Sequence, residues 1–140
     1  MSSKRIRHFG IVVHDADRAC ETWCSAFGMT KAADMQIDEE GIRSVFVSIG
    51  GTLDEMAIEL MEPLDKSDLN NAVARRLAQK GEGFYHVCLE VESVADSAAT
   101  LSERRMRVIH RDAVGGGGQG RWLVHPKDAH GVMVEGIEKL

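Results

Sequence analysis

The sequence lacks three features that would each point to a class of protein: a long apolar run, a concentration of basic residues and an even set of cysteines. No segment approaches the roughly 18 consecutive apolar residues of a membrane span, so no membrane association is expected. The formal net charge is -5 and the lysines and arginines are scattered, which argues against a nucleic-acid partner. The N-terminus runs directly into a strand-like segment. We therefore expect a cytoplasmic protein, or a mitochondrial matrix protein if a transit segment has been removed.

The three cysteines are Cys20, Cys24 and Cys88. Cys20 and Cys24 are four residues apart on an expected helix, where half of a zinc site could begin, but no second pair at suitable spacing completes it. We predict thiols packed in the core, because an unpaired cysteine usually behaves as a small apolar residue.

The pattern of apolar residues predicts the same element order twice. Hydrophobic residues make up 44% and charged residues 28% of the 140 positions, as in an ordinary single domain. The first copy has a strand, a helix capped by Asp15 or Asp17 and stopped near Gly28, and three extended segments. They lie at residues 6–13, 16–27, 35–38, 42–49 and 56–61. The second copy has the same order at residues 85–91, 94–105, 107–111, 120–124 and 132–137.

This duplication defines the predicted fold. Residues 1–140 form a single α+β domain of two βαβββ modules, at about residues 5–62 and 84–138, joined by a helix at about residues 68–81. Each module has one helix and one sheet face left to cover. We therefore expect a cupped mixed sheet around a shared cavity.

Four ionisable residues recur at matching places in the two modules. Glu59 follows His8 by 51 residues, and Glu135 follows His86 by 49. Alternation along each strand places these side chains on the face opposite the apolar rows. Buried carboxylates need compensation, and a cation is the simplest source of it. We therefore predict one metal site formed by His8, Glu59, His86 and Glu135.

The donor types favour a first-row divalent ion such as Co, Mn, Ni, Fe or Zn, without choosing among them. Four protein ligands on an octahedral ion would leave two adjacent positions for a bidentate substrate. Taken singly, each histidine would be read as structural and each glutamate as solvated. The alternative for the pairs is a cavity that binds ligands without metal.

The remaining polar motifs have weaker interpretations. His125 and His130 flank a predicted turn, and His110 is expected to face solvent. The glycine loop at residues 115–120 precedes a strand, so it does not fit a phosphate-binding loop; it is either a flap or a plain hairpin loop. The basic residues of the linking helix either form a solvated face or meet a phosphate. They are Arg75, Arg76 and Lys80.

Four segments carry a family resemblance: Arg7–Val13, Ile58–Pro63, Tyr85–Val91 and His125–Glu135. They resemble the vicinal oxygen chelate superfamily, which has the glyoxalase fold, and within it the methylmalonyl-CoA epimerases. The resemblance covers the chain from about residue 5 to residue 135. The second and fourth segments are fairly specific to the epimerase branch, whereas the paired His and Glu residues mark the whole superfamily.

The resemblance implies a homodimeric metal-dependent isomerase with an acyl-CoA thioester as its small-molecule substrate. It also implies the ligand set His8, Glu59, His86 and Glu135, although many epimerases have glutamine at the second position. The reaction would be epimerisation at C2 of methylmalonyl-CoA through a metal-stabilised enolate.

Ser44 departs from the family pattern, because some bacterial epimerases have a proposed catalytic carboxylate at the matching position. A serine is a poor general base at neutral pH without an activating partner. This leaves Glu135 as the catalytic acid/base candidate and the second group unidentified. The alternatives are a glyoxalase-type lyase or a dioxygenase of the same superfamily, or a non-enzymatic resistance-type binding protein.

Overall fold

The computed structural model of the chain describes residues 1–113 and 120–139. It confirms the βαβββ order in each half. The first half consists of β1 (Ser3–Val12), α1 (Ala16–Glu21) with a π-helical continuation η1 (Thr22–Ala26), β2 (Thr30–Ile37), a 3-10 turn η2 (Asp38–Glu40), β3 (Ile42–Ser48) and β4 (Ala57–Pro63). The second half consists of β5 (Gly83–Val91), α3 (Val94–Glu103), β6 (Val108–Arg111), β7 (Arg121–Val124), a 3-10 turn η4 (Pro126–Asp128) and β8 (Met133–Ile137). The linking helix is α2 (Ala72–Lys80).

The strands belong to an eight-stranded mixed sheet with the order β2-β3-β4-β1-β5-β8-β7-β6. The β2–β3, β3–β4, β6–β7 and β7–β8 pairs are antiparallel, and β5 pairs with β8 in parallel. The chain divides into two compact units, Phe9–Tyr85 and Met1–His8 together with His86–Leu140. The division differs from the sequence repeat, because the start of β1 belongs to the unit that holds the second half.

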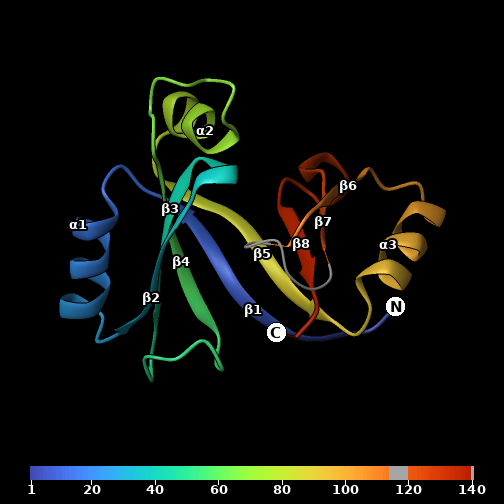
Figure 1. Cartoon of the computed structure of the whole chain (residues 1–140), viewed down its shortest axis with the longest axis horizontal. Helices are drawn as coiled ribbons and strands as arrows, with labels where there is room; N and C mark the ends of the chain where they lie inside the picture. Colours follow the sequence, from blue (N-terminus) through green and yellow to red (C-terminus); the bar gives the residue numbers. More distant parts are fainter. Residues whose placement is uncertain (114–119, 140) are drawn as a thin grey trace. The chain divides into compact units, whose positions relative to one another are not determined.

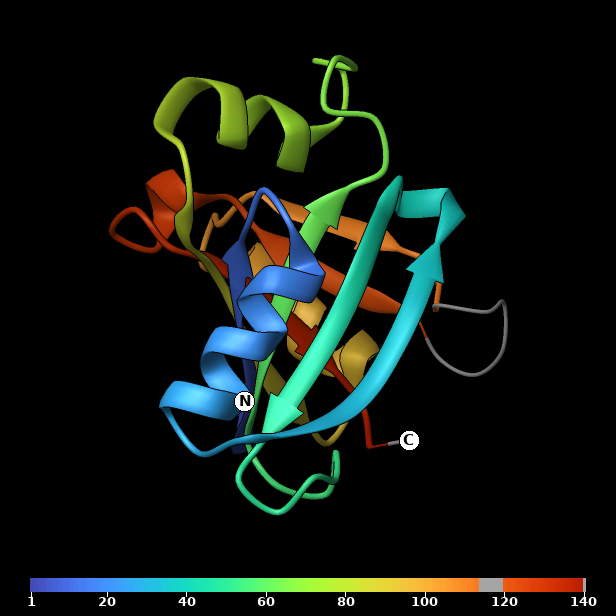
Figure 2. The same cartoon turned by 90° about the vertical axis from the view of Figure 1, so that its left-hand side faces the viewer.

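In the unit Phe9–Tyr85, α1 covers one face of the strands (Figures 1 and 2). The helix begins at Asp15, whose side chain accepts a 3.1 Å hydrogen bond from the backbone N–H of Arg18, as expected for an N-cap. Its apolar face includes Cys20 and Cys24, which remain thiols as predicted. Together with Ala16 of the same helix, that face packs in a cluster with Val13, Val45, Val47 and Leu60.

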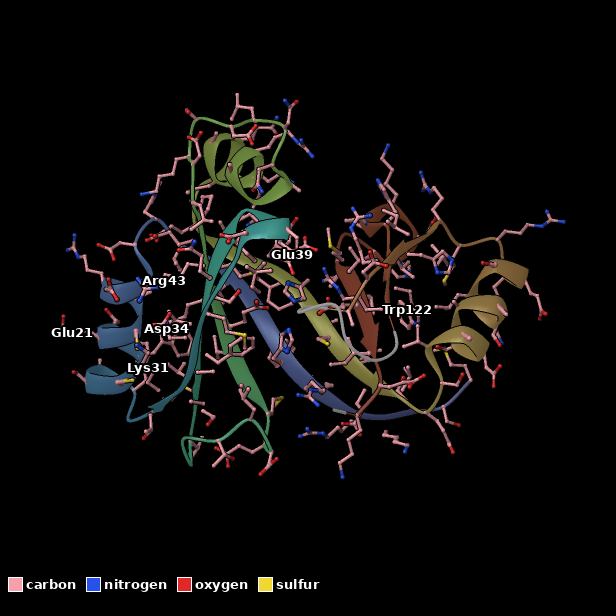
Figure 3. All side chains as sticks on the ribbon, viewed as in Figure 1. Glu21, Lys31, Asp34, Glu39, Arg43 and Trp122 are labelled. Atoms are coloured by element: carbon pink, nitrogen blue, oxygen red, sulfur yellow. The ribbon has the colours of Figure 1, made fainter. Side chains whose placement is uncertain are left out.

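A surface network of ion pairs fixes α1 to its neighbouring strands. The Arg43 guanidinium donates to Asp17 on the helix and to Asp34 on β2, each at 2.8 Å. Lys31 donates to the second of these carboxylates at 2.7 Å (Figure 3). These hydrogen bonds hold the pKa of Asp34 well below its ordinary value, so the carboxylate stays charged at neutral pH.

In the other unit, α3 covers the strands through a core centred on Trp122 (Figures 1 and 3). The helix begins at Ser93, whose side chain accepts from the backbone N–H of Asp96. The Trp122 indole N–H donates to Ser97 Oγ at 2.8 Å, which satisfies a polar atom that would otherwise be buried without a partner. Gly136 lies directly opposite Trp122 in the β7–β8 ladder and leaves room for the ring.

The predicted turn around His125 is confirmed as η4. His125 Nδ1 accepts from the backbone N–H of Lys127 at 3.1 Å, and Asp128 accepts from both the backbone and the guanidinium of Arg107. These contacts close the connection between β7 and β8 and so help to set the register that places Glu135.

Among the described residues, no helix has the length and apolar character that a membrane span requires.

Candidate metal centre

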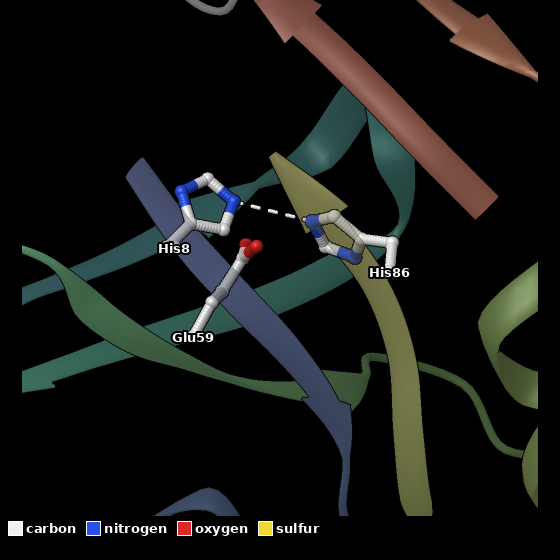
Figure 4. Close-up of side chains that lie close together, drawn as sticks. All are labelled: His8, Glu59 and His86. Carbon is white, nitrogen blue, oxygen red and sulfur yellow. Dashed lines mark hydrogen bonds between the residues drawn. The ribbon is translucent and has the colours of Figure 1, made fainter. Parts of the chain in front are cut away.

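Two imidazoles, one from the middle of β1 and one from the middle of β5, lie against each other. His8 Nε2 and His86 Nε2 are 3.1 Å apart, and the rings are nearly perpendicular (Figure 4). Their side chains are only 12% and 6% exposed. In β5 the alternation is as predicted, because Leu89 packs in the core of α3 while His86 lies on the other face. Each ring therefore directs a nitrogen to the same point.

Glu135 supplies a carboxylate at that point. Its Oε1 atom lies 3.6 Å from His8 Nε2 and 3.7 Å from His86 Nε2, and its side chain is buried. The parallel β5–β8 register places Glu135 opposite Cys88, whose thiol lies within 4.8 Å of both His8 and Glu135 ligand atoms. The structure thus brings together three of the four predicted ligands within one unit.

These donors fit a divalent first-row ion. Two ligand atoms bound at about 2.1 Å to the same ion lie about 3.0 to 3.4 Å apart at octahedral or tetrahedral angles. The observed separations of 3.1, 3.6 and 3.7 Å are close to that range. Two neutral imidazole nitrogens and one carboxylate oxygen are also the donor types that such ions prefer.

Glu59, the fourth predicted ligand, lies on β4 in the unit Phe9–Tyr85. Its carboxylate Oε2 accepts a 2.6 Å hydrogen bond from the Ser44 hydroxyl of β3, and both residues are buried. A charged carboxylate in this position is stabilised by the donated hydrogen bond. Its membership of the metal site stays a prediction of the sequence repeat.

Arg121 was missed by the sequence analysis. It lies on β7, and its Nη1 atom donates to Glu135 Oε2 at 2.6 Å. Trp122 and Val124 of the same strand are buried in the core, so Arg121 and Leu123 belong to the other face. Alternation along β7 is the signal in the sequence that puts Arg121 on the face away from the core. Its contact with Glu135 depends in addition on the β7–β8 register, in which Leu123 lies opposite Glu135.

Comparison with known protein families identifies the superfamily to which the chain belongs. The family model of the Glyoxalase/Bleomycin resistance protein/Dioxygenase superfamily matches residues 7–124. The chain belongs to this superfamily. The match confirms the resemblance inferred from the four sequence segments.

Among superfamily members, methylmalonyl-CoA epimerases are similar to this chain over nearly its whole length. The mitochondrial methylmalonyl-CoA epimerase of Bos taurus is 29% identical over 94% of this chain and 72% of its own. The ethylmalonyl-CoA/methylmalonyl-CoA epimerase of Cereibacter sphaeroides is 28% identical over 94% of this chain and 95% of its own.

Solved structures of superfamily members agree with this similarity. The methylmalonyl-CoA epimerase of Mycobacterium tuberculosis has a TM-score of 0.84 and 27% identity, covering 99% of this chain and 89% of its own. A variant of the Streptomyces coelicolor methylmalonyl-CoA epimerase in complex with 2-nitronate-propionyl-CoA has a TM-score of 0.84 and 28% identity, covering 99% of both chains.

The other histidines and arginines considered in the sequence contribute none of the three clustered donors. His110 is exposed on β6, as predicted, and His125 and His130 lie in the turn before β8. Arg75 and Arg76 donate to the backbone carbonyls of Leu69 and Phe84. The glycine loop at residues 115–120, for which a flap and a plain hairpin loop are the two interpretations, lies outside the described residues except for Gly120.

Proposed function

We propose that the chain is a metal-dependent epimerase that interconverts the C2 epimers of methylmalonyl-CoA or a closely related acyl-CoA. The observation that carries this proposal is the convergence of His8, His86 and Glu135 in a chain similar to methylmalonyl-CoA epimerases from end to end. Three donors from three separate strands are held in one buried cluster, which is the arrangement that a catalytic metal needs.

The proposed ligands are His8, His86 and Glu135, with Glu59 as the fourth as predicted from the repeat. A divalent ion bound to them would supply Lewis-acid polarisation of the thioester carbonyl, which makes the C2 proton more acidic. The metal remains one of Co, Mn, Ni, Fe or Zn.

Glu135 is the proposed catalytic acid/base. Its buried carboxylate lies beside both imidazoles of the same unit. Its Oε1 atom, which Arg121 does not hold, would exchange the proton with the substrate while detached from the ion. Inversion at C2 requires proton transfer on both faces of the carbon. Ser44 does not fit the second role, because its hydroxyl donates to Glu59 rather than accepting a proton.

The proposal is tested by hydrogen exchange at C2. The chain is loaded with Co or Mn and incubated in heavy water with methylmalonyl-CoA, and deuterium at C2 is followed by mass spectrometry or NMR. We expect incorporation well above a protein-free control and a loss of at least about a hundredfold for Glu135→Gln. Absence of exchange in the metal-loaded chain would reject the epimerase assignment.

A dioxygenase is the second candidate, because His8, His86 and Glu135 also form the 2-His-1-carboxylate set of non-haem iron oxygenases. Oxygen uptake by the iron-loaded chain with catechols distinguishes the two activities. Epimerisation without oxygen uptake supports the first proposal.

We also propose that the chain forms a homodimer, as its resemblance to the epimerases implies. The proposed location is the cytoplasm, or the mitochondrial matrix if a transit segment has been removed. Sedimentation equilibrium of the purified chain tests the assembly: a single species of twice the 15.4 kDa chain mass is expected.

A further inference from the structure

The two oxygens of the Glu135 carboxylate have different partners. Oε1 lies 3.6 and 3.7 Å from the two imidazole nitrogens, whereas Oε2 accepts a 2.6 Å hydrogen bond from Arg121 Nη1. The Arg121 side chain is only 14% exposed, so this contact is a partly desolvated ion pair. Charge-assisted hydrogen bonds of this kind are short and strong, and they fix the orientation of the carboxylate.

The β7 strand holds Arg121 firmly in this position. Trp122, the next residue, is buried, and its indole is hydrogen-bonded to Ser97 while its ring occupies the space above Gly136. A register slip of one residue would send Trp122 to the opposite face and bury the arginine in the core of α3. Arg121 Nε is also 3.4 Å from the Asp112 carbonyl oxygen.

A second arginine provides an internal comparison. Arg111 lies directly opposite Arg121 in the β6–β7 ladder, so both side chains leave the sheet on the same face. Arg111 is exposed and donates to the carbonyl of His110, whereas the described contacts of Arg121 include the candidate metal ligand. The two arginines thus carry the same charge on the same face but differ in exposure and in contacts, which for Arg121 include Glu135.

We propose that Arg121 is a positioning residue that keeps Glu135 a one-oxygen ligand and so preserves a coordination position for a chelating substrate. The inference rests on the proposed metal site. A carboxylate can bind an ion through one oxygen or two, and each additional oxygen occupies a further position. Because Arg121 engages Oε2, only Oε1 faces the imidazoles. A substrate that chelates through a thioester oxygen and a carboxylate needs two adjacent positions, and a two-oxygen Glu135 would remove one.

The test separates metal binding from chelate binding. Arg121→Met keeps the length of the side chain but removes its charge and donors, and Arg121→Lys restores a single donor. Co binding to each variant is measured by calorimetry, and malonate, a dicarboxylate that chelates through two oxygens, is then titrated into the Co-loaded protein. The visible spectrum of Co reports the change in coordination during both titrations.

We expect Arg121→Met to bind Co as tightly as the unaltered chain, or more tightly, and to bind malonate about tenfold more weakly or worse. Arg121→Lys should recover most of the malonate affinity. Arg111→Met, the matched control, should leave both affinities unchanged. Unchanged malonate affinity in Arg121→Met would overturn the inference. A loss of Co affinity of about ten- to a hundredfold would also overturn it, since that is the effect of a residue that merely orients a ligand.

Failure of the proposed metal site has a different signature. If the unaltered chain binds no Co, the site itself is rejected, and this inference is rejected with it. If the unaltered chain binds Co and all variants bind malonate equally, only the role of Arg121 is rejected. Thermal unfolding of each variant shows whether it is folded. If Arg121→Met is not folded, the comparison of Arg121→Lys with the unaltered chain still tests the inference.

Discussion

The hydroxyl of Ser44 donates a 2.6 Å hydrogen bond to Glu59 Oε2, and both residues are buried. The contact joins neighbouring strands, β3 and β4, on the same face of the sheet. Position 44 is where the sequence departs from the family pattern. The structure places a hydroxyl there that donates to a carboxylate on the neighbouring strand, and Ser44 supplies no carboxylate itself.

Ser44→Ala is therefore expected to destabilise the fold. Loss of the donor leaves a buried carboxylate oxygen with one hydrogen bond fewer, which costs about 1–3 kcal/mol in the free energy of unfolding. Ser48→Ala is the matched control, since Ser48 is also buried on β3 but donates to the backbone carbonyl of Thr52. Urea unfolding measures the free energy of unfolding of both variants. If Glu59 is a metal ligand, Ser44→Ala also weakens Co binding and the control does not.

Cobalt should raise the thermal stability of the chain through the two imidazoles. A ligand that binds only the folded state at a hundred times its Kd stabilises it by about 2.7 kcal/mol, and this appears as a higher Tm. We expect the increase for the unaltered chain and for His110→Ala, whose imidazole is exposed on β6. The increase should vanish for His86→Ala. An equal increase in both variants would place the bound Co elsewhere, and differential scanning calorimetry decides between these results.

The sequence predicted the element order and the clustering of His8, His86 and Glu135, because both follow from local rules. Alternation along β5 and β8 sets which face His86 and Glu135 occupy, and the repeat identifies His8 as the counterpart of His86. The start of β2 was predicted too late, near Met35 instead of Thr30, because its first residues are mostly polar and a bulge interrupts the ladder after Lys31.

Arg121 could not be placed by the same rules. Several arginines lie in the second half, and the one that meets Glu135 is decided by the β7–β8 register. That register depends on the η4 turn, where His125 and Asp128 accept backbone hydrogen bonds. A turn motif in the sequence predicts that the chain reverses, but not which residues face each other after it.

Gly136→Ala should destabilise the α3 core. A Cβ atom at this position would lie inside the van der Waals radius of the Trp122 ring, which is fully buried and held by its hydrogen bond to Ser97. Overpacking of this kind costs about 1–3 kcal/mol in the free energy of unfolding. Trp122→Phe removes part of the ring, so the double variant should lose less than the sum of the two single variants. Strict additivity in urea unfolding would show that the two residues do not compete for space.

The Arg107–Asp128 contact predicts an acid-sensitive contribution to stability. The side-chain hydrogen bonds from Arg107, reinforced by its backbone N–H, lower the pKa of Asp128 to about 2. A carboxyl group with a lowered pKa in the folded state stabilises the fold above its ordinary pKa, near 4, and loses that contribution as the pH falls toward 2. Asp128→Asn removes the titrating group and should be less stable than the unaltered chain at pH 6.

The difference between the two proteins should therefore shrink between pH 5 and about pH 3, as measured by urea unfolding at a series of pH values. Asp68→Asn is the comparison, because Asp68 is an exposed aspartate that accepts only a local backbone hydrogen bond and has no arginine partner among the described contacts. A difference between Asp128→Asn and the unaltered chain that stays constant over this range would mean that the Asp128 charge is not the source of the stabilisation. The η4 turn would then be held by the geometry of its backbone hydrogen bonds alone.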